Sequence, residues 1–191
     1  DIIKKAKKIN IPIIGEIEFA SKFTKLPILA VTGSNGKSTT VSIMYDMLKT
    51  ENLSPILAGN IGIPMSKIIL QEIKNLHNGN ILILEISSFQ LEFINQFRPN
   101  ISVFLNISPD HLDRHKNMDE YIRIKFKMIT NSKDDDKIVY NEDDDIFKKK
   151  FSGQRSNEIP FSLENKTQFF RINKTKIYDE KDELFCSLDE I

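Results

Sequence analysis

The sequence predicts an α/β fold in which a mostly parallel β-sheet, flanked by helices, is followed by a small C-terminal β extension. Short apolar runs at residues 28–31, 81–84 and 101–105 are typical of strands buried on both faces of a parallel sheet. Helix-like segments alternate with these runs, which implies crossover connections. After Phe151 the pattern changes to short candidate strands and polar turns, which favours a β extension over residues 151–191. The candidate strands there are residues 158–162, 169–172 and 184–187.

The first 25 residues do not follow this alternation, and we expect a linker or the tail of a preceding domain over residues 1–25. Their apolar run at residues 11–14 predicts a short buried strand that ends at Gly15.

Helical periodicity recurs in residues 37–50 and in residues 65–76, which predicts two amphipathic helices. The apolar stripes are Val41, Met44 and Leu48 in the first helix and Met65, Ile68, Ile69 and Leu76 in the second. A third helix is expected to begin after Asn117 and to run to about Thr130, because Asn117 with Glu120 three residues later is typical of a capping box.

A further strand is expected at residues 137–140, between the acidic triplets 134–136 and 143–145. Metal chelation by these carboxylates stays open. Because like-charged runs are usually exposed, a solvated loop and a helix start are the favoured interpretation.

Composition excludes several classes of function. The 191 residues include 27 Lys and Arg against 27 Asp and Glu, which disfavours general nucleic-acid binding because that needs surplus positive charge. No apolar run approaches the roughly 20 residues that span a bilayer, so no membrane is expected. The single cysteine, Cys186, fits a reducing, cytoplasmic compartment. Because the chain begins at Asp1 and not at Met, we expect a piece of a longer protein. The oligomeric state stays open, with a monomer favoured.

The strongest local signal is the P-loop-like segment Gly-Ser-Asn-Gly-Lys-Ser-Thr, between a buried strand and an amphipathic helix. Its glycines can adopt positive φ, and backbone N–H groups at a helix N-terminus favour phosphate oxygens. The lysine adds a full positive charge, and the serine after it offers a hydroxyl to Mg²⁺. The expected nucleotide contacts are Gly33, Ser34, Asn35, Gly36, Lys37, Ser38 and Thr39.

This loop departs from the common P-loop, which has four residues between its glycines and would place a glycine at Val31. Here only Ser34 and Asn35 separate the glycines. A Gly-rich turn capped by one of these two side chains is the alternative. The Gly-Lys-Ser directly after a buried strand favours nucleotide binding.

Three residues stand where functional groups gather in parallel sheets, at the carboxyl ends of strands or in the turns after them. Glu85 follows the strand at 81–84 and can hold Mg²⁺. His111 follows the third strand, and Asn60 lies in a turn after an apolar run. The alternatives are a solvent-facing Glu85, a His111 that caps a helix or pairs with Asp110, and a left-handed Asn60. Together with the loop, the functional interpretation is favoured.

Other polar residues are ambiguous by themselves. Ser87, Ser88 and Gln90 follow a buried strand, where polar groups act as helix caps or as ligand contacts. Lys125 lies on the predicted third helix, and no local pattern distinguishes it from Lys127.

Taken together, these segments resemble the Mur ligase family, the ATP-dependent amide ligases that build the peptidoglycan peptide. The shortened loop at 33–38 and Gly-Asn-Ile-Gly at 59–62 are similar to motifs of that family. So is Asp-His-Leu-Asp-Arg-His at 110–115, with Tyr121 and Lys125 after it. The resemblance runs from about Gly15 to Asp145 and implies a central ATP-binding ligase domain over residues 26–191.

The resemblance implies ATP and two Mg²⁺ ions as cofactors, held by residues that match the family motifs. Lys37 would hold the γ-phosphate of ATP. Ser38 and Glu85 would bind one Mg²⁺, and His111 would serve the second. Lys125 would be carbamylated by CO₂, which converts a cation into an anionic ligand for that second metal.

Within the family, Ser-Ser-Phe-Gln-Leu-Glu at 87–92 resembles the branch that adds D-glutamate to UDP-N-acetylmuramoyl-L-alanine. The resemblance implies that Asn60, Ser87 and Gln90 contact the UDP-linked substrate. The reaction would pass through an acyl phosphate made from ATP.

The resemblance covers one of the family's three domains, and it implies that residues 1–25 are a linker or the tail of a preceding UDP-binding domain. We expect the central domain to be inactive alone. The family's His-Asn-x-x-Asn segment, which contacts adenine, has no match here. The alternatives are a sibling Mur-type or folylpolyglutamate-type ligase, or a nucleotide-binding module without ligase activity. A P-loop kinase or GTPase is disfavoured because no Asn-Lys-x-Asp base-recognition motif is present.

Overall fold

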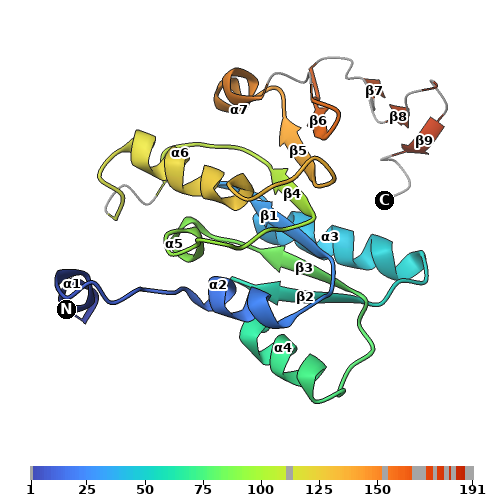
Figure 1. The fold of residues 1–191 in the computed structure, drawn as a ribbon. Helices are drawn as coiled ribbons and strands as arrows, with labels where there is room; N and C mark the ends of the chain where they lie inside the picture. The colour runs from blue at the N-terminus through green and yellow to red at the C-terminus, as the bar shows by residue number, and fades with distance from the viewer. Residues whose placement is uncertain are drawn as a thin grey trace.

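The computed structural model confirms the predicted α/β fold (Figure 1). It describes residues 2–110, 114–151, 155–164, 171–173, 176–178, 181 and 184–187. Within these residues the main sheet has six strands in the order β2-β3-β1-β4-β5-β6, and every pairing is parallel. The strands are β1 (Ile28–Thr32), β2 (Pro55–Gly59), β3 (Ile81–Glu85), β4 (Ile101–Phe104), β5 (Lys137–Asn141) and β6 (Glu158–Phe161).

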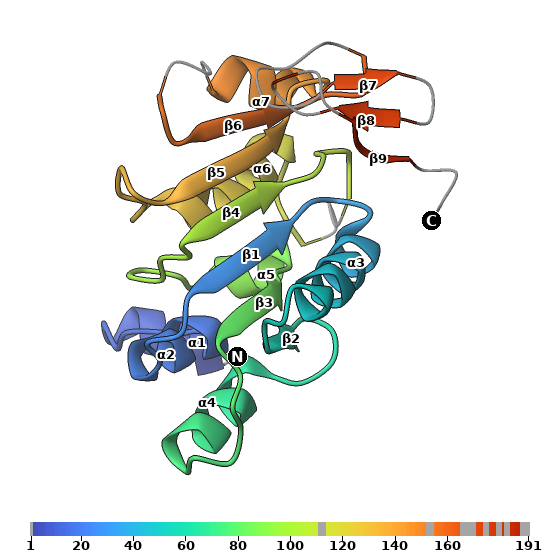
Figure 2. The ribbon, with the colours of Figure 1, turned by 90° about the vertical axis from the view of Figure 1, so that its right-hand side faces the viewer.

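Helices cover both faces of the sheet, so the strand side chains alternate between two apolar clusters. Leu29 and Val31 of β1 lie in the cluster under α3 (Lys37–Thr50), whose Val41 is fully buried. Ala30 lies in the cluster on the opposite face. That face is covered by α2 (Glu16–Ala20), α4 (Met65–Ile73), α5 (Ser88–Leu91), α6 (Met118–Phe126) and α7 (Asp145–Lys150). Figure 2 shows α3 on one side of the sheet and the helices labelled α5 and α6 on the other. The continuous apolar strands in the sequence reflect this two-sided burial.

The N-terminal segment differs from the prediction. Residues 11–15 form no strand, and Ile11 and Ile14 are 54% and 52% exposed. An apolar run alone cannot make a buried strand where no neighbouring strand pairs with it. A helix precedes the run instead, α1 (Ile2–Lys8), which buries none of its residues and lies apart from the sheet in Figure 1. A short 3₁₀ turn, η1 (Ser21–Phe23), follows α2.

The predicted helix over residues 65–76 is shorter in the structure. α4 ends at Ile73 because Asn75 takes a left-handed conformation with φ of 54°, which a continuing helix cannot contain. Leu76 therefore leaves the apolar stripe and is 67% exposed, whereas Met65, Ile68 and Ile69 are buried as predicted.

The predicted cap of the third helix is confirmed. Asn117 accepts the backbone N–H of Glu120 at 2.9 Å. The Glu120 carboxylate accepts the N–H of Lys116, one residue before the usual partner in a capping box. The helix continues past Phe126 as a 3₁₀ turn, η2 (Lys127–Ile129), which matches the predicted end near Thr130.

The C-terminal β extension begins later than predicted. β6 pairs in parallel with β5 and belongs to the main sheet. The extension is a separate antiparallel sheet of β7 (Arg171–Asn173), β8 (Lys176–Tyr178) and β9 (Leu184–Ser187). Phe169, where one predicted strand begins, lies outside the described residues.

The acidic triplets are less solvated than expected. Asp136 is 2% exposed and receives two hydrogen bonds from the Arg98 guanidinium. Asp144 caps α7 and accepts the backbone N–H of Ile107 at 2.7 Å, which ties α7 to the segment after β4. Among the described residues, no group of three or more His, Cys, Asp or Glu side chains is placed to hold a metal ion.

A buried carboxylate anchors α2. Glu18 is 1% exposed, and its Oε2 accepts the backbone N–H groups of Asn95, Gln96 and Phe97 at 2.9–3.0 Å. Burial raises the pKa of Glu18, but these three hydrogen bonds and the Lys22 ammonium outweigh it, so the pKa lies below its usual value. A glutamate from the expected linker region is thus part of the core.

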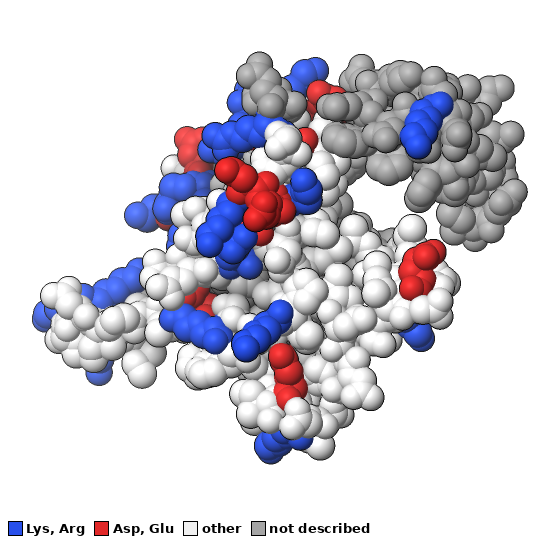
Figure 3. All heavy atoms as spheres, turned by 45° about the vertical axis from the view of Figure 1, so that its right-hand side comes forward, with Lys and Arg blue, Asp and Glu red and all other residues white. Residues whose placement is uncertain are grey.

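Surface charge is mixed. Figure 3 shows Lys and Arg side chains next to Asp and Glu side chains on one face of the described structure. Among the described helices, none is long and apolar enough to cross a membrane.

Candidate functional site

The loop between β1 and α3 is held in shape by the segment after β4. Ser34 donates its backbone N–H to Asn106 O at 3.0 Å. The Asn106 side chain accepts the N–H of Asn35 at 2.9 Å and donates to Asn35 O at 3.1 Å. The loop is therefore braced by the neighbouring strand.

The two glycines of this loop play different parts. Gly36 has φ of 81° and caps α3, as the predicted positive φ requires. Gly33 does not have a positive φ, which corrects that expectation. A β-carbon on Gly33 would lie 3.0 Å from Leu105 Cβ, so its lack of a side chain allows close packing against the segment after β4.

Positive charge is concentrated at the carbonyl oxygen of Gly33. Lys37 Nζ donates to Gly33 O at 2.9 Å and to Ser34 O at 2.8 Å. Lys125 Nζ donates to the same Gly33 O at 2.9 Å, although the two lysines are far apart in sequence. When both side-chain amino groups are protonated, they create an electropositive spot at this shared acceptor, which favours a bound anion.

Lys125 is one of the most buried residues of the site, at 1% exposure, and not a solvated helix lysine. Its Nζ also lies 3.5 Å from Thr32 Oγ1 and 4.6 Å from the centre of the Tyr121 ring. Burial, the largest cause, and the nearby Lys37 charge together lower the pKa of Lys125 to about 7, although Asp110 partly opposes the change. Near neutral pH this amine therefore exists in part without its proton.

A chain of hydrogen bonds joins three of the predicted residues. Ser38 Oγ donates to Glu85 Oε2 at 2.7 Å, and Asn60 Nδ2 donates to Glu85 Oε1 at 2.7 Å. Glu85 is 1% exposed, so it is not a solvent-facing strand end. Asn60 is not left-handed, and its backbone N–H bonds Glu85 O at 2.8 Å. The carboxylate is thus oriented from two sides, next to the first turn of α3.

Gly59 permits this arrangement through a close approach of the β2 and β3 backbones. It has φ of 110°, and a β-carbon there would lie 2.3 Å from Glu85 O. We expect Gly59→Ala to lower the free energy of unfolding by about 3 kcal/mol, because it adds both strain and a clash with backbone. Urea denaturation measures this loss. The control is Gly62→Ala, with φ of 72° but no atom nearer than 3.7 Å. An equal loss in both variants would contradict the role of the clash.

Ser87 and Gln90 form the helix-cap alternative that the sequence left open. Gln90 Oε1 accepts from the N–H of Ser87 at 3.0 Å and from its hydroxyl at 3.2 Å, as part of a capping box that begins α5. Both side chains are half-buried, two and five residues after Glu85. The same two side chains can therefore cap α5 and still contact a ligand.

Two predicted site residues remain, Thr39 and His111. Thr39 is exposed on the first turn of α3. His111 lies outside the described residues, so its predicted metal role stays a prediction.

Two residues that support the loop were given no site role from the sequence, although Tyr121 was noted as part of a family-like segment. Asn106 supports the loop, and Tyr121 OH shares a hydrogen bond of 3.1 Å with Ser34 Oγ. Ser34 Oγ also bonds Ser108 N and O, so a buried hydroxyl ties the loop to the segment after β4. An asparagine directly after a buried strand was the only available signal for Asn106.

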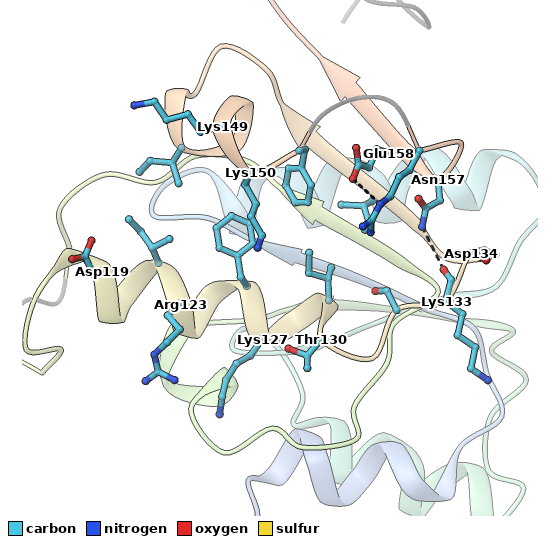
Figure 4. A pocket seen from close by; sticks show the side chains of 18 residues that line it. Asp119, Arg123, Lys127, Thr130, Lys133, Asp134, Lys149, Lys150, Asn157 and Glu158 are labelled. Carbon is cyan, nitrogen blue, oxygen red and sulfur yellow. Dashed lines mark hydrogen bonds and ion pairs between the residues drawn. The ribbon is translucent and has the colours of Figure 1, made fainter.

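A large cavity lies elsewhere, between α6, α7, β5 and β6. It measures about 940 Å³ and contains none of the predicted site residues. Lys150 Nζ lies 5.3 Å from the centre of the Phe126 ring. Figure 4 shows that Lys127 and Lys149 point in other directions than Lys150. Its basic side chains do not converge, unlike the two lysines at Gly33.

Comparisons with known proteins agree with this geometry. A family model described as the Mur ligase middle domain matches residues 31–190. A UDP-N-acetylmuramoylalanine–D-glutamate ligase of Thermoanaerobacter pseudethanolicus is 41% identical over 162 residues, 85% of this chain and 35% of that protein. A protein of the same name from Lachnoclostridium phytofermentans is 38% identical over 196 residues, 100% of this chain and 42% of that protein. The chain therefore spans less than half the length of these relatives.

Solved structures share the fold at lower identity. The MurF ligase of Thermotoga maritima in complex with ADP has a TM-score of 0.62 and 22% identity, with 88% of this chain and 42% of that chain covered. A UDP-N-acetylmuramoyl-L-alanyl-D-glutamate–2,6-diaminopimelate ligase has a TM-score of 0.64 and 20% identity, with 88% and 40% covered. With the family model matching most of its length, the chain belongs to the Mur ligase family as a middle domain.

Proposed function

We propose that this chain is the ATP-binding part of a longer cytoplasmic ligase that joins D-glutamate to UDP-N-acetylmuramoyl-L-alanine. The observation that carries the proposal is the pair of lysines, Lys37 and Lys125, that share Gly33 O beside the Ser38–Glu85 contact. Relatives at 38–41% identity bear the name of this activity. We propose that UDP-N-acetylmuramoyl-L-alanine and D-glutamate are its substrates.

The chemistry explains why such a site needs concentrated positive charge. A carboxylate resists attack by an amine because it is already anionic. Transfer of the γ-phosphoryl group of ATP to the carboxylate yields ADP and an acyl phosphate, and the amine of D-glutamate then displaces phosphate to form the amide. Because the first step brings anionic phosphate and carboxylate together, Lys37 lowers its barrier by offsetting their repulsion.

The oxygens of Ser38 and Glu85 fit a Mg²⁺ ion. A serine hydroxyl and a buried carboxylate 2.7 Å apart are hard oxygen donors of the kind that Mg²⁺ takes in nucleotide sites. Asn60 holds the other carboxylate oxygen at 2.7 Å and so fixes its direction. When bound, the ion neutralises phosphate charge. We infer one ion from these two residues, and a second would need His111.

Lys125 is proposed to react with CO₂ to form a carbamate, because only an unprotonated amine attacks CO₂. Its pKa of about 7 supplies that form at neutral pH, whereas an exposed lysine would be almost wholly protonated. The carbamate would place a negative charge at a position that carries a positive charge when Lys125 is protonated. That negative charge would face Lys37 and any bound metal ion.

We expect Lys125 to titrate with a midpoint near pH 7 in a CO₂-free buffer, measured from the ¹³Cε and ¹⁵Nζ NMR shifts of labelled lysine. Its amine is protonated below that pH and neutral above it, so carbamate formation should rise through the same range. Lys37→Ala removes a nearby positive charge and should raise the midpoint, while Lys49→Ala, at the far end of α3, should not. A midpoint near the ordinary lysine pKa of about 10.4 would refute this account.

The proposed function is tested by phosphate release from the full-length enzyme with Mg-ATP and UDP-N-acetylmuramoyl-L-alanine. Each candidate amino acid is added in turn. Turnover with D-glutamate supports the proposal, and turnover with lysine or diaminopimelate in its place excludes it. Binding of Mg-ATP without any turnover would indicate a nucleotide-binding module.

A further inference from the structure

Two proposed substrate contacts, Ser87 and Gln90, lie at a helix that is too short to be stable by itself. α5 spans only Ser88–Leu91, four residues. A single helical turn is unstable alone because nucleation costs more than one turn of hydrogen bonds returns. Contacts from other elements must therefore fix the turn of Ser87 and Gln90.

His115 supplies one of these contacts. Its Nε2 shares a hydrogen bond of 3.0 Å with Ser88 Oγ. The two residues are 3% and 2% exposed, so water does not compete for either partner. No step of the proposed reaction uses His115, which is a buried polar side chain aimed at the first residue of α5.

Arg114 and His115 together enclose the next residue of α5. The His115 ring stacks on Phe89 with 5.9 Å between ring centres, and the Arg114 guanidinium lies 4.9 Å from the same ring. Arg114 also forms an ion pair of 2.8 Å with Glu92, directly after α5. Two consecutive residues thus hold α5 at its first two positions and at the residue that follows it.

The same histidine contacts the helix that carries Lys125. The His115 and Tyr121 rings lie 5.3 Å apart, and Tyr121 OH bonds Ser34 Oγ in the phosphate loop at 3.1 Å. A continuous set of buried contacts therefore runs from Ser88 to Ser34. Through it, the position of α5 is set relative to the loop.

We propose that His115 is a positioning residue that holds the Ser87–Gln90 turn in register with the phosphate loop, so that the UDP-linked substrate meets ATP in the correct place. The inference rests on the proposed function for its substrate. Loss of the Ser88–His115 hydrogen bond should weaken binding of that substrate and leave nucleotide binding intact.

The test compares Ser88→Ala and His115→Phe, which each remove the hydrogen bond, with His115→Gln, which keeps a polar group near the position of Nε2. In the full-length enzyme we expect KM for UDP-N-acetylmuramoyl-L-alanine to rise about tenfold in the first two, with KM for ATP unchanged. His115→Gln should stay within about threefold of the parent. The double variant should be no worse than either single one, since both remove the same bond.

Ser102→Ala is the matched control, because Ser102 is also buried, at 1% exposure, and its hydroxyl has no hydrogen-bond partner among the described residues. It should change neither KM. Equal changes in both KM values, or a lower melting temperature with both KM values unchanged, would overturn the positioning role.

Amide hydrogen exchange separates this proposal from the proposed function. In the 191-residue chain, Ser88→Ala should speed exchange of the Leu91 and Glu92 amides, which bond Ser87 O and Ser88 O, while the α3 amides keep their protection. This readout needs no turnover, so an enzyme with another substrate would still show it. Unchanged exchange at these amides would reject the positioning role.

Discussion

Lys37→Ala is expected to lower phosphate release by the full-length enzyme about a thousandfold and to abolish measurable Mg-ATP binding by this chain. Lys37 Nζ already lies within the loop, held by Gly33 O and Ser34 O at 2.9 and 2.8 Å. It needs no large movement to meet a phosphate, and no other described side chain on α3 takes this place. Calorimetry on the chain and coupled phosphate assays on the enzyme measure the two effects.

The control for this substitution is Lys49→Ala, which removes the same charge from the last turn of the same helix. Lys49 is exposed and lies over the Tyr45 ring at 5.5 Å, far along α3 from the loop. It should leave ATP binding unchanged. Equal ATP affinity in the parent chain and in Lys37→Ala would show that the loop does not bind nucleotide.

Glu18→Ala is expected to lower the free energy of unfolding by about 3 kcal/mol, which is large for a single polar residue. The substitution leaves three backbone N–H groups without the carboxylate oxygen that they share. It also leaves a space in the contact between α2 and the segment after α5. Urea denaturation followed by circular dichroism measures the loss. Glu16→Ala, two residues earlier and exposed, should cost less than about 1 kcal/mol.

The stability of the protein at acid pH should also depend on Glu18. Because the folded pKa of Glu18 is lowered, its contribution is complete above the unfolded pKa of about 4.3 and is lost as the pH falls through the folded value. Stability of the parent should therefore fall more steeply below about pH 4.3 than stability of Glu18→Gln. Parallel curves for the two proteins would show that Glu18 does not carry this dependence.

Local patterns predicted most of the sheet and its first crossover. The helix over residues 37–50 has the predicted limits, and the buried runs at 28–31 and 81–84 lie inside observed strands. These features depend on neighbouring residues, so sequence spacing reveals them. The apolar run at residues 11–14 has the same strand-like pattern, but it forms no strand in the structure. Strand pairing depends on the whole sheet and not on neighbouring residues alone.

The site could be predicted only in part, because its decisive contacts join distant residues. The loop sequence indicated Lys37, and the end of a strand indicated Glu85. Nothing local distinguished Lys125 from Lys127, yet only Lys125 reaches Gly33 O. Likewise Glu18 resembled any linker glutamate until the fold placed three N–H groups around it. Family resemblance, not periodicity, singled out Lys125.

The strand order has a consequence for synthesis on the ribosome. β1 and β2 are not neighbours in the sheet, and both pair with β3. The nascent chain therefore carries two apolar strands with free edges until β3, which ends at Glu85, has left the exit tunnel. Lys125 emerges later still, so the electropositive spot at Gly33 forms after this interval. Chaperone contact and aggregation during translation should thus concentrate on nascent chains shorter than the one that exposes β3.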